Sequence, residues 1–500
     1  LEEVVVTGYG TTKKRDLVTS VASVSADQLK DVPVVSAAEA LQGKLAGVSV
    51  TTSEGSPDAE VKIRVRGGTS LTQSSEPLYI VDGFPVSSIS DIAPGDIASM
   101  DVLKDAAATA IYGAQGANGV IIITTKDIKT GDESFKWNVD YTGYMGWRTL
   151  AKKYDMMNGE DYLRMQYEFA YLDGKGSDDK MLSNFYKFYD PAYNAENKTH
   201  GTLSSVLEYW AGIGDDDWQE ATFGGNHLNS NHNISISGGI KKANFNLNYN
   251  RIDDNSIMYG SNYIRNNASL KMKFQPIKNL NISATVRFSN TDVLGSGTNP
   301  AEDTGSKGES RLRNATSFVP LHGIEVKLKD LEDDTDLGNL YNPVIAIDDN
   351  YKHKVDNKLT VSGYISYKFL KHFTVKAEAG YEMRDVNREQ YFGRTAYFTR
   401  AGDGLSVAQS LVSNPQDYVN ALTYNYHTSR FKETNTFEYA QKFNDNAHDF
   451  SILIGEEQVI KKGNSLTSTH YCLDKSFTGN TIFASLDQAL RRDDIVYIDP

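Results

Sequence analysis

Residues 99–126 read SMDVLKDAAATAIYGAQGANGVIIITTK, and this stretch decides the predicted fold more than any other. Apolar residues at Met100–Leu103 predict a strand. The Ala-rich run that Asp105 opens predicts a short helix, which ends at Gly113. Glycines then mark a turn, and Gly119–Thr125 is a second predicted strand. This order of elements indicates a compact domain of the α+β class.

Two more motifs precede this stretch. EEVVVTGYG occupies residues 2–10, and PLYIVDGFPV occupies residues 77–86. In this order the three motifs resemble the N-terminal part of TonB-dependent outer-membrane transporters, whose plug domain ends in a segment like residues 99–126. Within these transporters, the chain is similar to the SusC/RagA-type family of nutrient importers.

The resemblance implies a mainly β fold, in which an α+β plug domain lies inside a transmembrane antiparallel β-barrel of 22 strands in the full family fold. It implies active import of oligosaccharides, the products of glycan breakdown, across the outer membrane of a Gram-negative, Bacteroidetes-like cell. A SusD-like surface lipoprotein would cap the barrel, TonB would supply the force, and no cofactor would be needed. An oligopeptide importer of the same family and a siderophore or haem receptor are the alternatives. Whether transporter–lid pairs form dimers is left open.

The composition argues against nucleic acid as a partner. The chain has 51 Lys and Arg against 65 Asp and Glu, a net charge of −14, so phosphates would be repelled. Cys472 is the sole cysteine, and no Cys–His cluster has the spacing of a zinc site. The acidic runs at residues 215–217 and 330–336 lack the spacing of a calcium-binding loop, so we expect them to be solvated and predict no metal site.

Neither a catalytic site nor a membrane helix is predicted. No Ser–His–Asp set or pair of carboxylates stands out, so an enzyme is not expected. No run of 18 apolar residues occurs, which excludes a membrane-spanning helix but not a barrel of alternating strands. From another class of function, the alternative is a soluble β-rich protein that binds or hydrolyses carbohydrate, which would be extracted without detergent.

After residue 131 apolar and polar residues alternate with the period of a strand. In NFNLNYN, Phe245 and Leu247 share one face with Tyr249, and asparagines occupy the other face. NLNISATVRFSN at residues 279–290 sets Ile282 and Val286 against Arg287 and small polar residues in the same way. A soluble β-sandwich also alternates, but here tight connections alternate with very long ones, which is typical of outer-membrane barrels.

The chain divides into three predicted regions. Residues 1–14 form a TonB box and linker, residues 15–130 the plug domain, and residues 131–500 the N-terminal part of the barrel with long extracellular loops. The last region has room for roughly nine to eleven strands. An open sheet of that size would leave two unpaired edges in lipid, so we expect the chain to be an incomplete portion of a longer protein.

The segment that precedes the plug is the predicted TonB-binding site. It is extended and β-branched, as recognition by strand addition requires. An ordinary edge strand would have the same composition, and the position before a plug-like domain favours the TonB box. The predicted contact residues are Glu3, Val4, Val5, Val6 and Thr7.

Charged residues predict an ionic latch between the plug and the barrel. Arg64 and Arg66 lie on one face of a predicted strand, while Glu378 and Glu438 fall at predicted inward positions of the barrel. The resemblance implies that plug arginines meet glutamates on the barrel wall. A solvated charged face is the competing interpretation, and desolvation would limit the net energy of a buried pair.

Aromatic residues are candidates for contact with cargo. Phe84 follows the PLYIVDG strand, and Tyr391 lies close to a long loop. Aromatic rings stack well on sugar rings, although packing in the core or in an aromatic girdle is the commoner role of such residues.

Overall fold

The fold is described from a computed structural model. It covers residues 4–7, 10–13, 21–25, 28, 37–52, 61–65, 76–89, 92, 94–104, 110–126, 134–173, 179–225, 227–295, 311–324, 342–400, 403–443 and 448–489.

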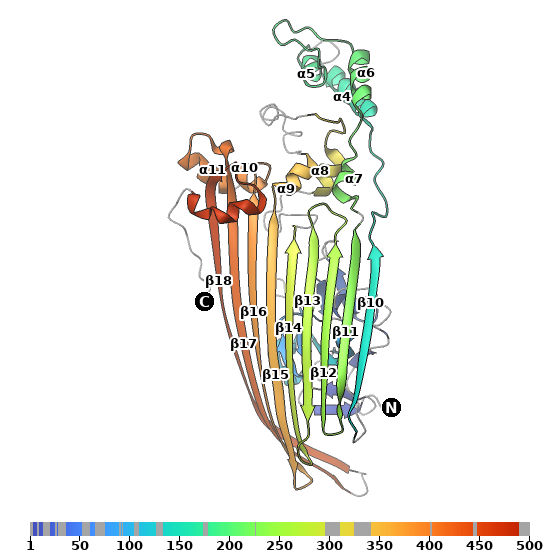
Figure 1. The fold of residues 1–500 in the computed structure, drawn as a ribbon, viewed down its shortest axis with the longest axis vertical. Helices are drawn as coiled ribbons and strands as arrows, with labels where there is room; N and C mark the ends of the chain where they lie inside the picture. The colour runs from blue at the N-terminus through green and yellow to red at the C-terminus, as the bar shows by residue number, and fades with distance from the viewer. Residues whose placement is uncertain are drawn as a thin grey trace.

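A nine-stranded antiparallel sheet, here called the wall, forms most of the described structure (Figure 1). Its strands follow chain order, so each one pairs with the strand before and after it, and β10 and β18 form its edges. The strands are β10 (Lys136–Trp147), β11 (Leu228–Ile240), β12 (Ala243–Asn255), β13 (Asn262–Phe274), β14 (Leu280–Leu294), β15 (Lys352–Phe369), β16 (Phe373–Phe392), β17 (Tyr418–Phe443) and β18 (His448–Asp474).

The two faces of the wall differ as the alternation predicts. On the outer face, the side chains of Leu247 and Ile365 are 42% and 53% exposed. On the inner face, the neighbouring polar side chains Asn248 and Thr285 are 4% and 6% exposed. The predicted alternation is therefore confirmed, with apolar side chains on one face of these strands and polar side chains on the other.

The two ends of the wall differ in their connections. At one end the strands are joined by tight turns, in which Asn279, Leu370 and Lys371 adopt positive φ angles of 69°, 46° and 65°. Such turns match the twist of the strands that they join. At the other end long segments carry the helices (Figure 1). These are α4 (Gly159–Asp173), α5 (Asp179–Tyr189), α6 (Leu203–Ile213), α7 (Trp218–Phe223), α8 (Arg311–Ser317), α9 (Pro343–Asp348), α10 (Tyr397–Arg400) and α11 (Asp403–Leu411). Among the described residues, no helix is long and apolar enough to cross a bilayer.

The N-terminal part of the chain packs behind the wall in Figure 1 and is called the plug below. Its main sheet has the order β3-β8-β9-β6-β7, and two further pairs are β4–β5 and β1–β2. The elements are β1 (Val4–Thr7), β2 (Gly10–Lys13), β3 (Val21–Ser25), α2 (Ala37–Ala40), β4 (Val48–Thr52), β5 (Val61–Val65), β6 (Leu78–Val81), β7 (Phe84–Val86), β8 (Ile97–Leu103) and β9 (Val120–Thr125).

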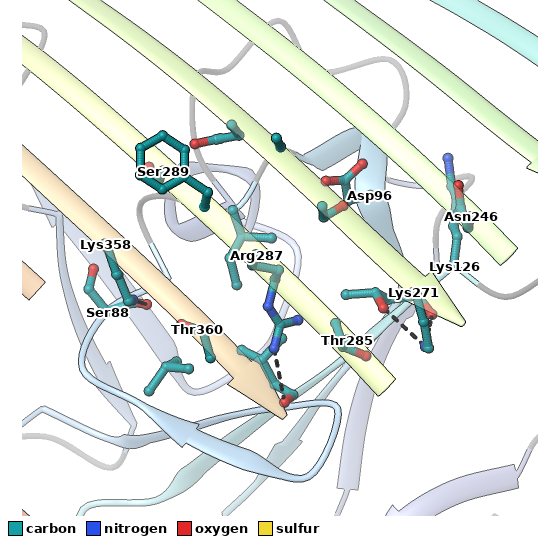
Figure 2. A pocket seen from close by; sticks show the side chains of 18 residues that line it. Ser88, Asp96, Lys126, Asn246, Lys271, Thr285, Arg287, Ser289, Lys358 and Thr360 are labelled. Carbon is teal, nitrogen blue, oxygen red and sulfur yellow. Dashed lines mark hydrogen bonds between the residues drawn. The ribbon is translucent and has the colours of Figure 1, made fainter. Parts of the chain in front are cut away.

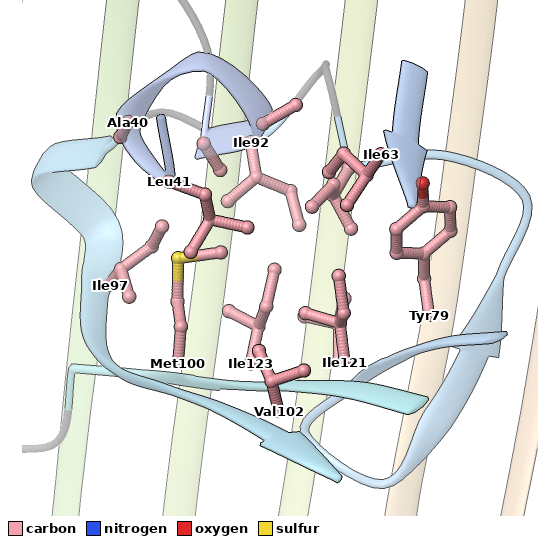
Figure 3. Close-up of a cluster of buried hydrophobic side chains, with 14 of the residues drawn as sticks. Ala40, Leu41, Ile63, Tyr79, Ile92, Ile97, Met100, Val102, Ile121 and Ile123 are labelled. Carbon is pink, nitrogen blue, oxygen red and sulfur yellow. The ribbon is translucent and has the colours of Figure 1, made fainter. Parts of the chain in front are cut away.

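The two strands predicted within residues 99–126 lie at the centre of the plug. They are present as β8 and β9, which pair with each other. Between them the chain forms a 3-10 helix over Ala110–Gly116, kinked at Gly113 with φ 57° and ψ −146°, whereas Asp105 lies outside the described residues. Figure 3 shows Met100, Val102, Ile121 and Ile123 from these strands pointing toward Leu41 and Ile92. All of these six side chains are buried, so the plug has an apolar core of its own.

We expect Ile123→Ala to destabilise the plug by about 2–5 kcal/mol, because truncation leaves a cavity in a packed core. Hydrogen exchange of the β9 amides should accelerate accordingly. Ile365→Ala on the exposed outer face of the wall is the matched control and should leave that exchange unchanged. Equal effects of both variants would contradict the assignment of Ile123 to the core.

Candidate functional site at the contact between plug and wall

The turn between β6 and β7 brings the plug against the inner face of the wall. Asp82 and Gly83 form this turn with positive φ angles of 48° and 87°. Asp82 lies at the centre of the contact: Lys271 Nζ of β13 is 3.3 Å from its Oδ1, and Arg287 Nη1 of β14 is 3.1 Å from its Oδ2. Thr125, at the end of β9, donates to the same carboxylate from its backbone N–H at 3.0 Å and from its hydroxyl at 2.7 Å. One carboxylate therefore joins two plug strands to two wall strands.

The charge of Asp82 depends on these partners. Burial alone would raise the pKa of Asp82, but Lys271, Arg287 and the Thr125 hydrogen bonds hold the pKa below its usual value of 3.8. The three charged side chains are only 11–16% exposed. In such surroundings, removal of one partner leaves an uncompensated buried charge, which is strongly destabilising.

Further cations of the wall bind backbone carbonyl groups of the same hairpin. Arg430 Nη1 donates to Pro85 O at 3.0 Å, and Lys432 Nζ donates to Gly83 O at 3.4 Å. Lys358 Nζ donates to Ser88 O at 3.2 Å, just after β7. Because these acceptors are main-chain atoms, the wall recognises the shape of the hairpin in addition to its side chains.

Glycines permit the close approach of the two parts. A Cβ atom at Gly83 would lie 2.7 Å from the Glu378 carboxylate, and one at Gly95 would lie 2.6 Å from the Asn233 amide nitrogen. At Gly380 of β16 a Cβ atom would collide with the ring of Phe84. The plug therefore contacts wall strands from β11 to β17. At the three glycines the backbone of one part lies against a side chain of the other part.

A small cavity of about 50 Å³ with a mixed polar and apolar lining lies within this contact (Figure 2). Asp96 and Lys126 of the plug line it together with Arg287 and Asn246 of the wall. Asp96 Oδ1 is buried and accepts no hydrogen bond from any residue that the structure describes. Burial raises the pKa of Asp96 from 3.8 to about 7, although Lys126, Arg287 and Arg265 oppose that rise.

Comparisons with known proteins agree with this architecture. Residues 13–120 match the family model described as the TonB-dependent receptor plug domain. The TonB-dependent receptor SusC of Bacteroides thetaiotaomicron is 34% identical over 318 residues, which cover 61% of this chain and 27% of that protein. The chain resembles the SusC-type TonB-dependent transporters in sequence and in fold.

A second relative extends the match along the chain. TonB-dependent receptor P3 of Formosa agariphila is 30% identical over 468 residues, which cover 91% of this chain and 40% of that receptor. The chain thus spans less than half of the length of these two relatives.

Solved structures show the same fold. The RagAB peptide importer in its open-open state matches with a TM-score of 0.73 and 24% identity, covering 99% of this chain and 53% of that one. The pyoverdine receptor FpvA of P. aeruginosa matches with a TM-score of 0.52 and 11% identity, covering 94% and 46%. At these identities the two likenesses establish the fold alone.

The residues predicted for the ionic latch occupy different environments. Arg64 is exposed on β5, and Arg66 lies outside the described residues. Glu378 is on the inner face of the wall and pairs with Lys376 Nζ at 2.6 Å, while Glu438 is half-buried on β17. The two ion pairs at Asp82 have the opposite polarity, because there the plug supplies the carboxylate and the wall supplies the cations.

The contact of Asp82 was not predicted, although the sequence carries a signal for it. Asp82 stands in the Asp-Gly turn of the quoted PLYIVDGFPV motif, and alternation alone places Arg287 on the polar face of its strand. What the sequence could not show is that residues 189 and 205 positions apart meet.

The other predicted site residues are partly described. Val4–Thr7 form β1, which pairs with β2 in a hairpin, whereas Glu3 lies outside the described residues. Phe84 is 2% exposed in the plug core and packs on Gly380. Tyr391 is also 2% exposed, in an apolar cluster with Val419 and Leu473. Contact of Phe84 or Tyr391 with cargo stays a prediction and would require these rings to become exposed.

We predict that Asp82→Asn loosens the plug, because Lys271 and Arg287 lose the charge that they share. Breaking a buried ion pair destabilises by roughly 3–5 kcal/mol, so the urea concentration at which the plug becomes sensitive to protease should fall clearly. Lys153→Gln, which breaks an exposed pair with Asp217 at 2.8 Å, is the control and should have little effect. Equal shifts in both variants would show that Asp82 is not an anchor.

Asp96 should make the seating of the plug depend on pH. Its pKa is raised by folding, so its contribution to stability is complete below pH 3.8, falls as the pH rises, and is lost above about 7. Asp96→Asn should therefore flatten the decline in unfolding midpoint between these pH values. Because the pKa of Asp82 lies below this window, Asp82→Asn should lower the midpoint without removing the decline. A decline of wild-type size in Asp96→Asn would contradict the prediction.

Proposed function

We propose that this chain is part of a TonB-dependent importer that carries oligosaccharides across the bacterial outer membrane together with a SusD-like surface lipoprotein. The observation that carries the proposal is a folded plug held by ionic contacts against the polar face of a sheet whose opposite face is apolar. The similarity to SusC-type transporters supports the same function. The domain boundaries expected from the sequence, at residues 14 and 130, are part of this proposal.

The outer face of the wall is suited to lipid. On β14 the outward residues are apolar from Leu280 to Phe288, a span of about 27 Å along a tilted strand. Above this band the outward residues become charged, as in the pairs Asp292–His353 and Asp385–His427, with N–O distances of 2.8 and 2.6 Å. The helix-bearing loops lie on that charged side, so we assign them to the cell exterior. A soluble sandwich or hydrolase would not expose such a band to water.

Import would proceed by force on the N-terminal segment. TonB would bind Val4–Thr7, together with Glu3, by strand addition and pull on the chain that leads into the plug. The contacts that resist this force are those at Asp82 and the carbonyl groups of the same hairpin. Their disruption would move the plug from the wall and open a path for cargo.

The class of cargo has three candidates. The resemblance to SusC-type sequences favours oligosaccharides, and 34% identity to SusC itself supports this choice. RagAB, which has the same fold, is a peptide importer, so an oligopeptide is the second candidate. A siderophore is the third, and it has only the distant fold likeness to FpvA in its favour. The lid lipoprotein and the pairing of transporter–lid complexes are likewise proposals.

The test is uptake of labelled oligosaccharides by cells that make the complete transporter, with and without TonB. Val5→Pro removes a backbone donor from β1 and should reduce uptake to the level of cells without TonB, whereas binding of cargo to the purified protein persists. Val5→Thr keeps the β-branched shape and the N–H group, and it should support uptake. Import by Val5→Pro at the wild-type rate, or import that needs no TonB, would refute the proposed mechanism.

A further inference from the structure

Three neighbouring strands place two cations and an aromatic ring side by side on the inner face of the wall. In the strand register Lys354 of β15 lies opposite Arg388 of β16, and Arg388 lies opposite Tyr424 of β17. The Arg388 guanidinium carbon is 5.5 Å from the centre of the Tyr424 ring. This row is here called the basic row.

The basic row faces inward and lies above the plug. Side chains of a strand alternate between faces, and Arg430 and Lys432 of β17 point inward because they bind the plug. Tyr424 precedes Arg430 by an even number of positions, so it shares that face at a distance of about 20 Å along the strand. This position lies toward the helix-bearing end of the wall, on the route from that end to the plug.

The charges of the basic row are not balanced within the described structure. Four positions nearer the plug, Lys358 and Arg384 also lie opposite each other. There each cation has a carboxylate, since Lys358 pairs with Glu382 at 3.5 Å and Arg384 with Asp356 at 2.6 Å.

Lys354 and Arg388, in contrast, form no ion pair with any residue that the structure describes. Arg388 Nε is buried and donates no hydrogen bond to a described residue. Like charges directly opposite each other destabilise a sheet, so an anion bound between Lys354 and Arg388 would relieve an existing repulsion.

Aromatic rings adjoin this unbalanced charge. Tyr426 is the next inward residue of β17, and its ring stacks on that of Tyr424 with centroids 6.2 Å apart and an interplanar angle of 11°. Both rings are half-buried, so part of each remains accessible. Tyr424 orients the guanidinium group of Arg388, which leaves Tyr426 as the apolar surface beside the cations.

We propose that the basic row and the neighbouring Tyr426 together form a binding site for acidic oligosaccharide. In this site Lys354 and Arg388 bind a sugar carboxylate, and Tyr426 contacts the face of the sugar ring. The inference rests on the proposed import function for its biological meaning, but binding at this site needs neither TonB nor movement of the plug. An acidic peptide would satisfy the cations equally well. The flat ring of Tyr426 favours the sugar, because the axial C–H groups of a pyranose pack on an aromatic face.

The test is calorimetric titration of the purified transporter in detergent with tetragalacturonate, with neutral galactotetraose and with tetraglutamate. Tetragalacturonate should bind about tenfold or more tightly than galactotetraose, as charge-assisted hydrogen bonds predict. Arg388→Gln and Lys354→Gln should each remove most of this preference. Tyr426→Ala should weaken both sugars, and Tyr426→Phe should restore them. Lys462→Gln, at an exposed outward position of β18, is the matched control and should bind as the wild type does.

Each outcome decides the inference separately from the import function. Equal affinity for the acidic and neutral sugars, or wild-type binding by Arg388→Gln, would overturn the site even if TonB-dependent uptake is observed. Tighter binding of tetraglutamate than of tetragalacturonate would overturn the assignment to sugar. Preferential tetragalacturonate binding that is lost in Arg388→Gln would uphold the site, even in cells where uptake proves independent of TonB.

Discussion

The inner face of the wall is polar, and a charged group on it that the plug covers needs a partner of opposite charge there. The Asp82 carboxylate meets this need for two cations at once, because it pairs with both Lys271 and Arg287. The plug is thus bound by the same face that would line a water-filled channel in its absence. A polar lining suits both states, because it can bind the seated plug and can be hydrated after the plug moves.

The contact between the plug and the wall contributes less net free energy than its number of polar bonds suggests. A buried ion pair gains little net energy over separated, hydrated ions, because desolvation offsets the attraction. The bonds from Arg430, Lys432 and Lys358 to carbonyl groups have water as an equally good alternative partner. The apolar core around Met100 and Ile123, by contrast, gains from burial and has no such alternative. A pulling force should therefore separate the plug from the wall before it opens the core of the plug.

The alternation of residues was sufficient to predict the wall but not the contact that it makes. Period-two patterns in residues 243–294 placed Leu247 and Ile282 on the same face of the sheet. The pattern is clear because all side chains on one face of a strand lie in the same surroundings and are therefore similar in polarity. The positive φ angles at Asn279 and Lys371 explain how the tight turns fix the register between strands. The plug strands β8 and β9 were likewise predictable from apolar runs bounded by glycines.

The partners of charged residues were not predictable, because local sequence does not show which surfaces meet. Arg64 has the alternation of a strand, which indicates that one face is charged but not what that face contacts. Phe84 and Tyr391 illustrate the same limit, since an aromatic ring near a loop can be exposed or can be the centre of a cluster. The basic row could be recognised only from the strand register, which places Lys354 opposite Arg388 although the two residues are 34 positions apart in the sequence.

The most direct test of the central claim uses adjacent residues of β15 with opposite orientation. Ile365→Cys and Ser366→Cys would each carry a nitroxide label in the protein reconstituted in lipid vesicles, and collisions with oxygen and with a water-soluble nickel complex would be compared. The account predicts that the label at 365 favours oxygen, as in a bilayer, and that the label at 366 does not. A label at 366 that favours oxygen, or a label at 365 that favours the nickel complex, would contradict a wall with lipid on one side and the plug on the other.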